Sequence, residues 1–190
     1  FTLPKKTEGA PIYVVTSALS MISAGRVSPT DFGAMPKLIA PDPTSPALYT
    51  QSGAHDYRFV GINFGTEPSE ANDGLVRLGT GGETASVDFP SRIILDRCVV
   101  RGDSTSGGRR GVLLAGNHLA VIGCHIDGWK LVGFDAQAVC GWTGSGPWRI
   151  ENNYLEGAGE NLMIGGADTA VQNLTPSDIQ ISGNTFFKPL

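Results

Sequence analysis

The chain has 190 residues, of which 41% are hydrophobic and 17% are charged, and its formal net charge is −4. The acidic balance and the lack of a basic stripe argue against nucleic-acid binding, and no apolar run approaches the roughly 20 residues that a membrane-spanning helix needs. With 26 glycines and 12 prolines, the composition is typical of many short strands joined by tight turns.

The first 50 residues are the least regular part of the sequence. Pro11–Thr16 and Pro36–Ala40 each predict a short strand, and the polar segment Ser17–Gly33 between them predicts a loop or one short helix. Because the chain starts at Phe1 without a Met and stops at Leu190 directly after a strand-like run, we expect both ends to be cut from a longer protein. Any localisation signal would then lie outside this sequence.

An internal repeat organises residues 51–190. Five segments have alternating apolar residues that lead to a turn: Tyr57–Phe64, Ile93–Val100, Leu119–Ile126, Trp148–Leu155 and Ile179–Phe186. Their alignment gives one column, which consists of Ile62, Cys98, Cys124, Asn153 and Asn184. The irregular steps of roughly 30 residues suit the coils of a parallel β-helix, and they are too variable for a propeller or a leucine-rich solenoid.

A second strand follows each of the first four repeat segments: Leu75–Leu78, Val112–Ala115, Asp135–Val139 and Asn161–Ile164. The two-residue period of a strand predicts which side chains point into the core. One inward layer comprises Val76, Val112, Ala136 and Leu162, and the next comprises Leu78, Leu114, Ala138 and Ile164. One outward column comprises Leu75, Gly111, Asp135 and Asn161, and the next comprises Arg77, Leu113, Gln137 and Met163.

These patterns predict an all-β protein that folds as a right-handed parallel β-helix, or solenoid, of about five irregular coils. We expect one domain over residues 1–190, with 1–50 as an irregular first coil and 51–190 as the regular coils. The coils at the two open ends expose strand edges, so the chain is expected to self-associate through them.

Two kinds of residue in the repeat column are expected to serve the scaffold. Asn153 and Asn184 lie where the chain bends between strands, and stacked side-chain amides can bond to one another along such a column. Cys98, Cys124 and Cys140 have neither CxxC nor zinc spacing, and their odd number argues against a disulfide framework. The cysteines are therefore expected to be small buried residues.

Six motifs resemble those of bacterial right-handed parallel β-helix repeat proteins of the pectate-lyase-like superfamily: Phe1–Lys6, Asp96–Cys98, Arg109–Val112, Cys140–Trp142, Asn152–Asn161 and Asn184–Pro189. The resemblance covers nearly the whole chain and implies the same fold. Members include pectate lyases, polygalacturonases and the chondroitinase and alginate lyase group. The resemblance therefore implies an extracellular or cell-surface protein that binds or cleaves a uronic-acid polysaccharide, as a polysaccharide lyase or a glycoside hydrolase.

The sequence departs from the family at its best-known catalytic motifs. It lacks the RxPxxR run of the pectate lyases, and it lacks the paired aspartates and the Gly-His-Gly set of the polygalacturonases. These departures favour the alternative of a non-catalytic β-helix that serves as a surface, filament or adhesive scaffold. A third hypothesis is that coils beyond Leu190 complete a site of which this chain holds half.

A charged groove is predicted on the outward face of the second strands, where Arg109, Arg110, Asp135 and Glu160 are the catalytic candidates. A lyase must neutralise the sugar carboxylate with a cation and remove a proton with a base. Arg109 or Arg110 would bind the sugar acid, and Asp135 with Glu160 would hold a metal, for which Ca²⁺ is the expected ion. The structural alternative is that these charges form salt bridges or cap bends.

Substrate binding is assigned to Arg77, Gln137 and Trp142. Trp142 lies in the Gly-rich segment Cys140–Pro147, which is expected to be an exposed turn that offers the indole ring to a sugar. A glycoside hydrolase would instead need two carboxylates about 5–10 Å apart. Asp135 with Glu160, or Glu156 with Glu160, are the candidates for that pair.

Overall fold

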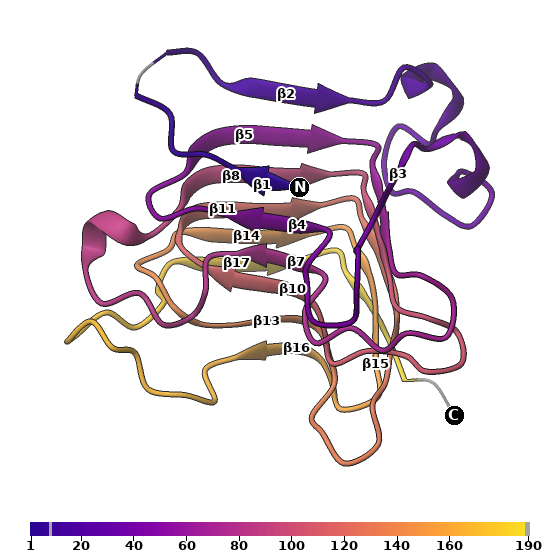
Figure 1. The fold of residues 1–190 in the computed structure, drawn as a ribbon. Helices are drawn as coiled ribbons and strands as arrows, with labels where there is room; N and C mark the ends of the chain where they lie inside the picture. Colours follow the sequence, from indigo (N-terminus) through magenta and orange to yellow (C-terminus); the bar gives the residue numbers. More distant parts are fainter. Residues whose placement is uncertain (8, 189–190) are drawn as a thin grey trace.

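The computed structural model describes residues 1–7 and 9–188, which wind into a solenoid of three parallel sheets (Figure 1). Each sheet has six strands, and strands that are neighbours in a sheet are separated by two others in the sequence. Each coil of the chain therefore adds one strand to each sheet, which confirms the predicted parallel β-helix. The predicted cut at Leu190 and residue Pro189 of the last motif lie outside the described residues.

The three sheets are named here A, B and C. Sheet A consists of β1 (Thr2–Leu3), β4 (Leu48–Thr50), β7 (Val76–Leu78), β10 (Arg110–Ala115), β13 (Gln137–Thr143) and β16 (Glu160–Ile164). Sheet B consists of β2 (Ile12–Val15), β5 (His55–Val60), β8 (Ser91–Asp96), β11 (Asn117–Ile122), β14 (Trp148–Glu151) and β17 (Ile179–Ser182). Sheet C consists of β3 (Lys37–Ile39), β6 (Asn63–Gly65), β9 (Val99–Arg101), β12 (His125–Trp129), β15 (Tyr154–Gly157) and β18 (Thr185–Phe187).

In the part of the chain that the structure describes, helical structure is confined to single turns. The 3-10 helices are η1 (Leu19–Met21), η2 (Phe32–Ala34) and η3 (Ser86–Asp88). Within residues 1–7 and 9–188, none of the helices has the length and apolar character that a membrane crossing requires.

Each eight-residue repeat segment holds two strands, one of sheet B and one of sheet C, separated by a tight turn. The turn residue has a positive φ, which is 69° at Gly61, 49° at Arg97, 64° at Gly123, 55° at Asn152 and 65° at Gly183. A left-handed backbone at one residue redirects the chain, and glycine adopts it without steric cost. Each coil therefore has three strands, whereas the sequence predicts at least two.

The column that follows this turn is a ladder of hydrogen bonds along the solenoid axis. The backbone N–H of Cys98 donates to Sγ of Cys124 at 3.3 Å, and the N–H of Cys124 donates to Oδ1 of Asn153 at 2.8 Å. The N–H of Asn153 donates to Oδ1 of Asn184 at 2.9 Å. The predicted column is confirmed, and Sγ of Cys124 accepts a hydrogen bond in it at the place where the later coils have asparagine.

Burial keeps the Cys124 thiol protonated. Cys98 and Cys124 have no exposed surface, and burial, the largest cause, raises the pKa of the Cys124 thiol. A protonated thiol can also donate, and Sγ of Cys124 lies 3.5 Å from the carbonyl oxygen of Leu95. The Cys124 side chain therefore both accepts a bond from the preceding coil and donates one to it. The Asn153 amide does the same, because it accepts from the N–H of Cys124 and donates to the carbonyl oxygen of Val121.

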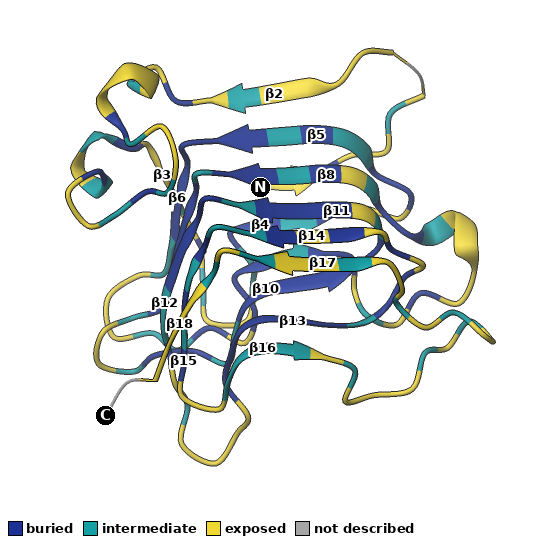
Figure 2. Ribbon diagram, turned by 180° about the vertical axis from the view of Figure 1, so that it is seen from behind, coloured by how far each residue is buried: buried dark blue, intermediate teal, exposed yellow. Residues whose placement is uncertain are grey.

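The core fills the interior between the three sheets. Val76 pairs with Val112, Leu78 pairs with Leu114, and none of the four is exposed, which confirms these predicted inward positions. Figure 2 shows that the middle strands of sheet B are mostly buried, with single exposed residues, while β2 and β17, on the first and last coils, are largely exposed. The end strands lack a neighbouring coil that would cover them within the described residues.

The predicted register of β13 is wrong. Val139, rather than Ala136, pairs with Val112 and occupies that inward layer. Ala138, Val139 and Cys140 are all fully buried. A uniformly apolar run carries no alternation from which the inward side could be recognised, and the larger Val139 fills the layer better than an alanine would.

The polar segment of the first coil is a strap over the outer face of sheet C. The strap, defined as Ser17–Pro36, contains η1 and η2 and packs Ile22, Val27 and Met35 against Val99. Nη1 of Arg26 donates to Oγ1 of Thr185 at 2.9 Å, so the strap reaches from the first coil to the last. The strap forms one wall of the groove described below.

Candidate functional site

Most residues predicted for catalysis and substrate binding lie on the outer face of sheet A. The group is called here the sheet A cluster and consists of Arg77, Arg109, Arg110, Gln137, Trp142 and Glu160. The strand register places Arg110, Gln137 and Glu160 side by side on three neighbouring strands. Gln137, which is 1% exposed, donates from Nε2 to Oε2 of Glu160 at 2.8 Å.

Trp142 is not in the exposed turn that the sequence predicts. It belongs to β13, is half-buried, and packs with the apolar side chains of Leu113, Cys140 and Met163. Its Nε1–H donates to the carbonyl oxygen of Gly81 at 2.9 Å. The Gly-rich corner begins two residues later at Gly144, so composition placed the turn too early and the indole ring serves packing.

The three arginines of the sheet A cluster are held by partners within the protein. Nη1 of Arg109 and Nη2 of Arg77 each lie 3.3 Å from the carboxylate of Asp73. The guanidinium of Arg110 lies over the Trp142 ring, 5.4 Å from its centroid. The ion pair of Arg109 matches the expected alternative in which these charges form salt bridges, and the cation–π contact gives Arg110 an internal partner of another kind.

Three polar atoms of the sheet A cluster are nevertheless buried without a hydrogen-bond partner among the described residues. They are Nε of Arg109, Nε of Arg110 and Oε1 of Gln137. Such atoms carry a desolvation cost that a ligand group could relieve. The catalytic and substrate-binding assignments of this cluster therefore stay predictions.

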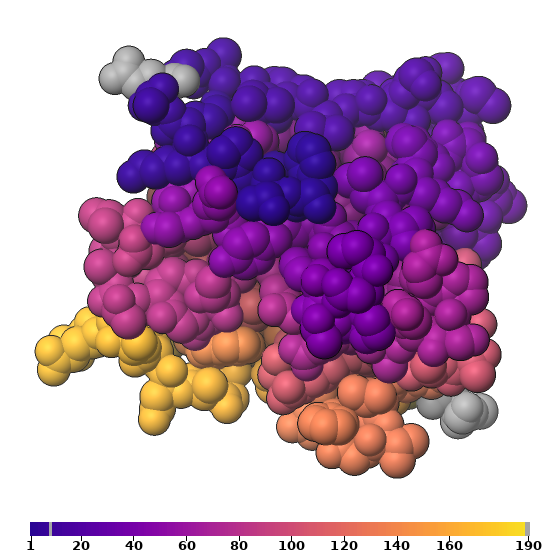
Figure 3. All heavy atoms as spheres, in the orientation of Figure 1, coloured from indigo at the N-terminus to yellow at the C-terminus, as the bar shows by residue number. Residues whose placement is uncertain are grey.

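Asp135 stands apart from the other predicted residues. It is exposed in the loop that joins β12 to β13, and that loop protrudes at the bottom of the space-filling view (orange in Figure 3). The outward column that placed Asp135 beside Gly111 is wrong, because Gln137 is the first residue of β13 and pairs with Arg110. Residues 1–7 and 9–188 contain no group of three or more His, Cys, Asp or Glu side chains arranged to hold a metal. Calcium binding by Asp135 and Glu160 stays a prediction.

A larger collection of charged side chains lies in a groove on the outer face of sheet C. The sheet C groove has a volume of about 810 Å³, and five consecutive coils contribute to it. Its walls are the strap and the loops that follow β6, β9 and β12. The lining residues that matter here are Phe32, Lys37, Arg101, Asp127, Lys130 and Glu156.

Arg101 and Asp127 form a two-pronged ion pair at the centre of this groove. They pair in register on β9 and β12, with Nε–Oδ1 and Nη2–Oδ2 distances of 2.9 and 2.6 Å. The guanidinium also lies 4.7 Å from the centroid of the Phe32 ring, which the strap supplies. Burial raises the pKa of Asp127, but bonds from His125 and Arg101 outweigh it, so the pKa lies below its ordinary value. Asp127 is therefore a fixed anion that orients Arg101.

Glu156 lies on the next strand and has no basic partner among the described residues. Its Oε2 accepts a hydrogen bond from the hydroxyl of Tyr154 at 3.2 Å, and its Oε1 lies 3.4 Å from the N–H of Gly128. Burial, followed by the charge of Glu156, raises the pKa of Tyr154 to about 12. Tyr154 is therefore a neutral proton donor that faces a carboxylate.

Lys37 and Lys130 supply the positive charge of the groove that is not already neutralised. Both are exposed, both line the groove, and neither forms an ion pair with any residue in the described part of the chain. An ammonium group that is exposed in a groove and unpaired is available to an anionic ligand.

These groove residues were missed because each of them lies one residue beyond the end of an aligned repeat segment. Three positions after the ladder column, the sequence has Arg101, Asp127 and Glu156 in consecutive coils. The two-residue period of the strand makes that position face outward. The signal was a third outward column, which lies directly after the aligned segments on the strands β9, β12 and β15.

No protein-family model, no curated protein and no solved structure matches the chain. The parallel β-helix is established by the strand pairing alone. Membership of the pectate-lyase-like superfamily stays a prediction from the sequence motifs.

Proposed function

We propose that the protein binds an acidic polysaccharide of the uronic-acid type in the sheet C groove. The observation that carries the proposal is the presence of two unpaired lysines, Lys37 and Lys130, in one groove with the fixed guanidinium of Arg101. Uronic-acid chains carry a carboxylate on each sugar, and ammonium and guanidinium groups are the side chains that pair with carboxylates. An extracellular or cell-surface location is part of this proposal.

The shape of the groove supports a polymer over a small molecule. Strands β3, β6, β9, β12 and β15 all contribute lining residues. Five strands at the spacing of parallel sheets extend over about 19 Å along the solenoid axis. A ligand that lies along the axis would therefore meet Lys37 on the first coil and Glu156 on the fifth.

Cleavage by elimination is a second candidate, which the pairing of Glu156 with Tyr154 favours. An elimination needs a base that takes the proton beside the sugar carboxylate and an acid that protonates the departing oxygen. Glu156 could take the proton from carbon, and the protonated Tyr154 hydroxyl could give its proton to the leaving oxygen. The bond between that oxygen and the sugar breaks as the carbon–carbon double bond forms.

Isothermal titration calorimetry of the chain with polygalacturonate, alginate and chondroitin tests binding, with neutral dextran as the comparison. We expect the acidic polymers to bind with an affinity that falls as salt is added, and dextran not to bind. Lys37→Gln with Lys130→Gln should weaken binding by at least about tenfold. Lys5→Gln, which removes a lysine outside the groove, is the matched control.

Ultraviolet absorbance of the unsaturated product, with and without Ca²⁺, separates cleavage from binding in the same samples. Product that disappears in Glu156→Gln supports the second candidate, and binding without product supports the first. Equal binding of dextran and the acidic polymers, or unchanged affinity in the double lysine variant, would overturn the proposed function in favour of the scaffold alternative.

A further inference from the structure

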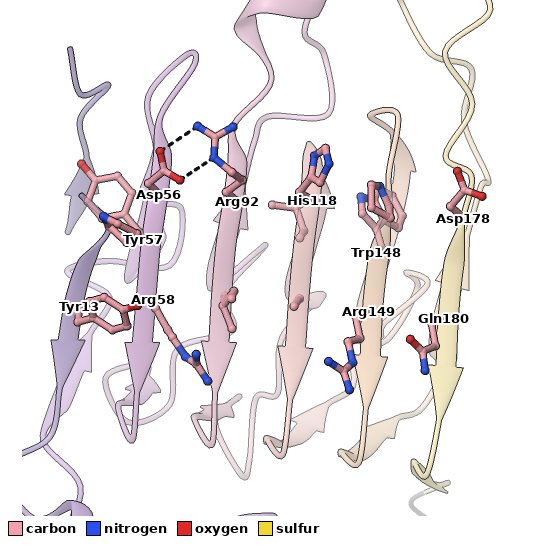
Figure 4. A pocket seen from close by; sticks show the side chains of 15 residues that line it. Tyr13, Asp56, Tyr57, Arg58, Arg92, His118, Trp148, Arg149, Asp178 and Gln180 are labelled. Atoms are coloured by element: carbon pink, nitrogen blue, oxygen red, sulfur yellow. Dashed lines mark hydrogen bonds and ion pairs between the residues drawn. The ribbon is translucent and has the colours of Figure 1, made fainter. Parts of the chain in front are cut away.

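A second groove, on the outer face of sheet B, has a different chemical character (Figure 4). The sheet B groove has a volume of about 480 Å³ and is lined by residues on or beside all six strands of the sheet. Figure 4 shows two rows of side chains across these strands: Asp56, Arg92, His118 and Asp178 near the strand starts, and Tyr13, Arg58, Arg149 and Gln180 two residues further on.

The middle of this groove has an apolar floor between basic side chains. The floor consists of Ile94 and Ala120, which pair in register on β8 and β11 and lie in the second row. Along the axis, Arg58 precedes the floor and Arg149 follows it, because Arg58 pairs with Ile94 and Ala120 pairs with Arg149. Ala120 has the smallest side chain of this row, so the floor is lowest there.

Arg92 and His118, two residues of the first row, have the left-handed backbone conformation that favours glycine. Arg92 and His118 have φ values of 52° and 54°, and these residues begin the rim beside the floor. At the other turn of the same coils the left-handed position is often glycine, as at Gly123. A left-handed residue with a Cβ costs about 1 kcal/mol or more, and Arg92 and His118 carry that cost at the rim of the groove.

The basic groups around the floor are not fully neutralised. Arg58 and Arg97 share the single carboxylate of Asp96, at 2.6 and 2.9 Å. Arg92 binds Asp56 through Nε and Nη2, and Arg149 pairs with Glu151. Among the described residues, no hydrogen bond engages Nη1 of any of the three arginines that line the groove.

We propose that the sheet B groove binds an aromatic carboxylate. The flat ring lies on Ile94 and Ala120, and the carboxylate pairs with Arg58, whose charge Asp96 only partly cancels. His118 and Arg92 close the rim on one side, and Asp178 repels the carboxylate from the opposite end of the groove. This site lies on another sheet from the sheet C groove and does not depend on the proposed polysaccharide.

Titration of the chain with 2-naphthoate, followed by ligand fluorescence and calorimetry, tests the site. We expect saturable binding that is at least about tenfold stronger than that of 2-naphthalenemethanol, which has the same ring without the charge. Ala120→Phe should abolish binding because the new ring covers the floor. Arg58→Gln should reduce naphthoate binding to the level of the alcohol, and it leaves Asp96 paired with Arg97.

Two controls make the outcome decisive. Lys130→Gln, in the sheet C groove, should bind naphthoate as the unchanged chain does, and circular dichroism checks that each variant keeps its strands. Equal affinity for naphthoate and the alcohol would show a merely apolar surface and would overturn the proposal. So would naphthoate binding that survives in both Ala120→Phe and Arg58→Gln.

Discussion

The sheet A cluster and the sheet C groove contain similar side chains and differ in what those side chains are bonded to. In the sheet A cluster, Gln137 bonds to Glu160 and the Arg110 guanidinium lies on Trp142. In the sheet C groove, Arg101 and Asp127 satisfy each other, yet Lys37, Lys130 and Glu156 have no ion-pair partner among the described residues. Proximity of charged residues is therefore weak evidence for a site, and charge that is left over after internal pairing is stronger evidence.

The largest expected effect is on stability and concerns the sheet A cluster. Trp142→Ala removes the half-buried ring that packs on Leu113 and Met163 and bonds to Gly81, so unfolding should become easier by about 2–4 kcal/mol. Urea denaturation measures this change, and polygalacturonate binding to the folded variant should be unaltered. A variant with normal stability and lost polysaccharide binding would restore Trp142 as the sugar platform that the sequence predicted.

Asp127→Asn should produce the next largest loss, about 1.5–3 kcal/mol, because it breaks a charge-assisted pair with Arg101. The pKa of Asp127 is lowered in the folded protein, so this stabilisation is complete above the ordinary value of 3.8 and is lost as the pH falls below it. Urea denaturation of both proteins over a pH series should show the difference shrinking below about pH 4. A difference that grows with acidification would contradict the assignment of Asp127 as a fixed anion.

Glu160→Ala should cost about 1–3 kcal/mol, since the buried Gln137 amide loses its acceptor. Glu160→Gln keeps an acceptor oxygen and is the matched control, with a smaller loss. Calorimetric titration with acidic polysaccharide should give the same affinity for both variants. A large drop in affinity without a change in stability would return Glu160 to the catalytic role that the sequence predicted.

The smallest effect on stability is expected for the double variant Lys37→Gln with Lys130→Gln. Both side chains are exposed and unpaired, so the free energy of unfolding should change by less than about 0.5 kcal/mol. The same variant is expected to lose polysaccharide affinity, which is the reverse of the pattern expected for the sheet A cluster. Destabilisation by more than about 2 kcal/mol would place these lysines with the structural charges instead.

The stacking of the coils was predictable because the repeat column recurs with clear alternation. Cys98, Cys124 and Asn153 align by their apolar neighbours alone, and the structure joins them in one ladder. The register of β13 was not predictable in the same way, because Ala138, Val139 and Cys140 are all apolar and give no alternation.

The candidate sites were less accessible to sequence reasoning. Arg101 and Asp127 lie one residue beyond the aligned segments, and their outward position depends on turns such as that at Arg97, which split each apparent strand into two. The rim of the sheet B groove depends on a left-handed backbone at Arg92 and His118, and the residue types at these two positions do not predict that conformation. Pairing of Asp73 with Arg109 spans two coils and follows from loop conformation, which composition does not determine.

The ladder makes each coil depend on the coil that follows it in the sequence. Each rung satisfies a backbone donor of the coil before it, so Asn184 serves Asn153 and Asn153 serves Cys124. Shortening the protein from its carboxyl side would strip an acceptor from the newly exposed coil. Shortening it from its amino side would remove Ile62, whose side chain accepts nothing. Removal or addition of coils, in evolution or by engineering, should therefore cost less stability at the amino end.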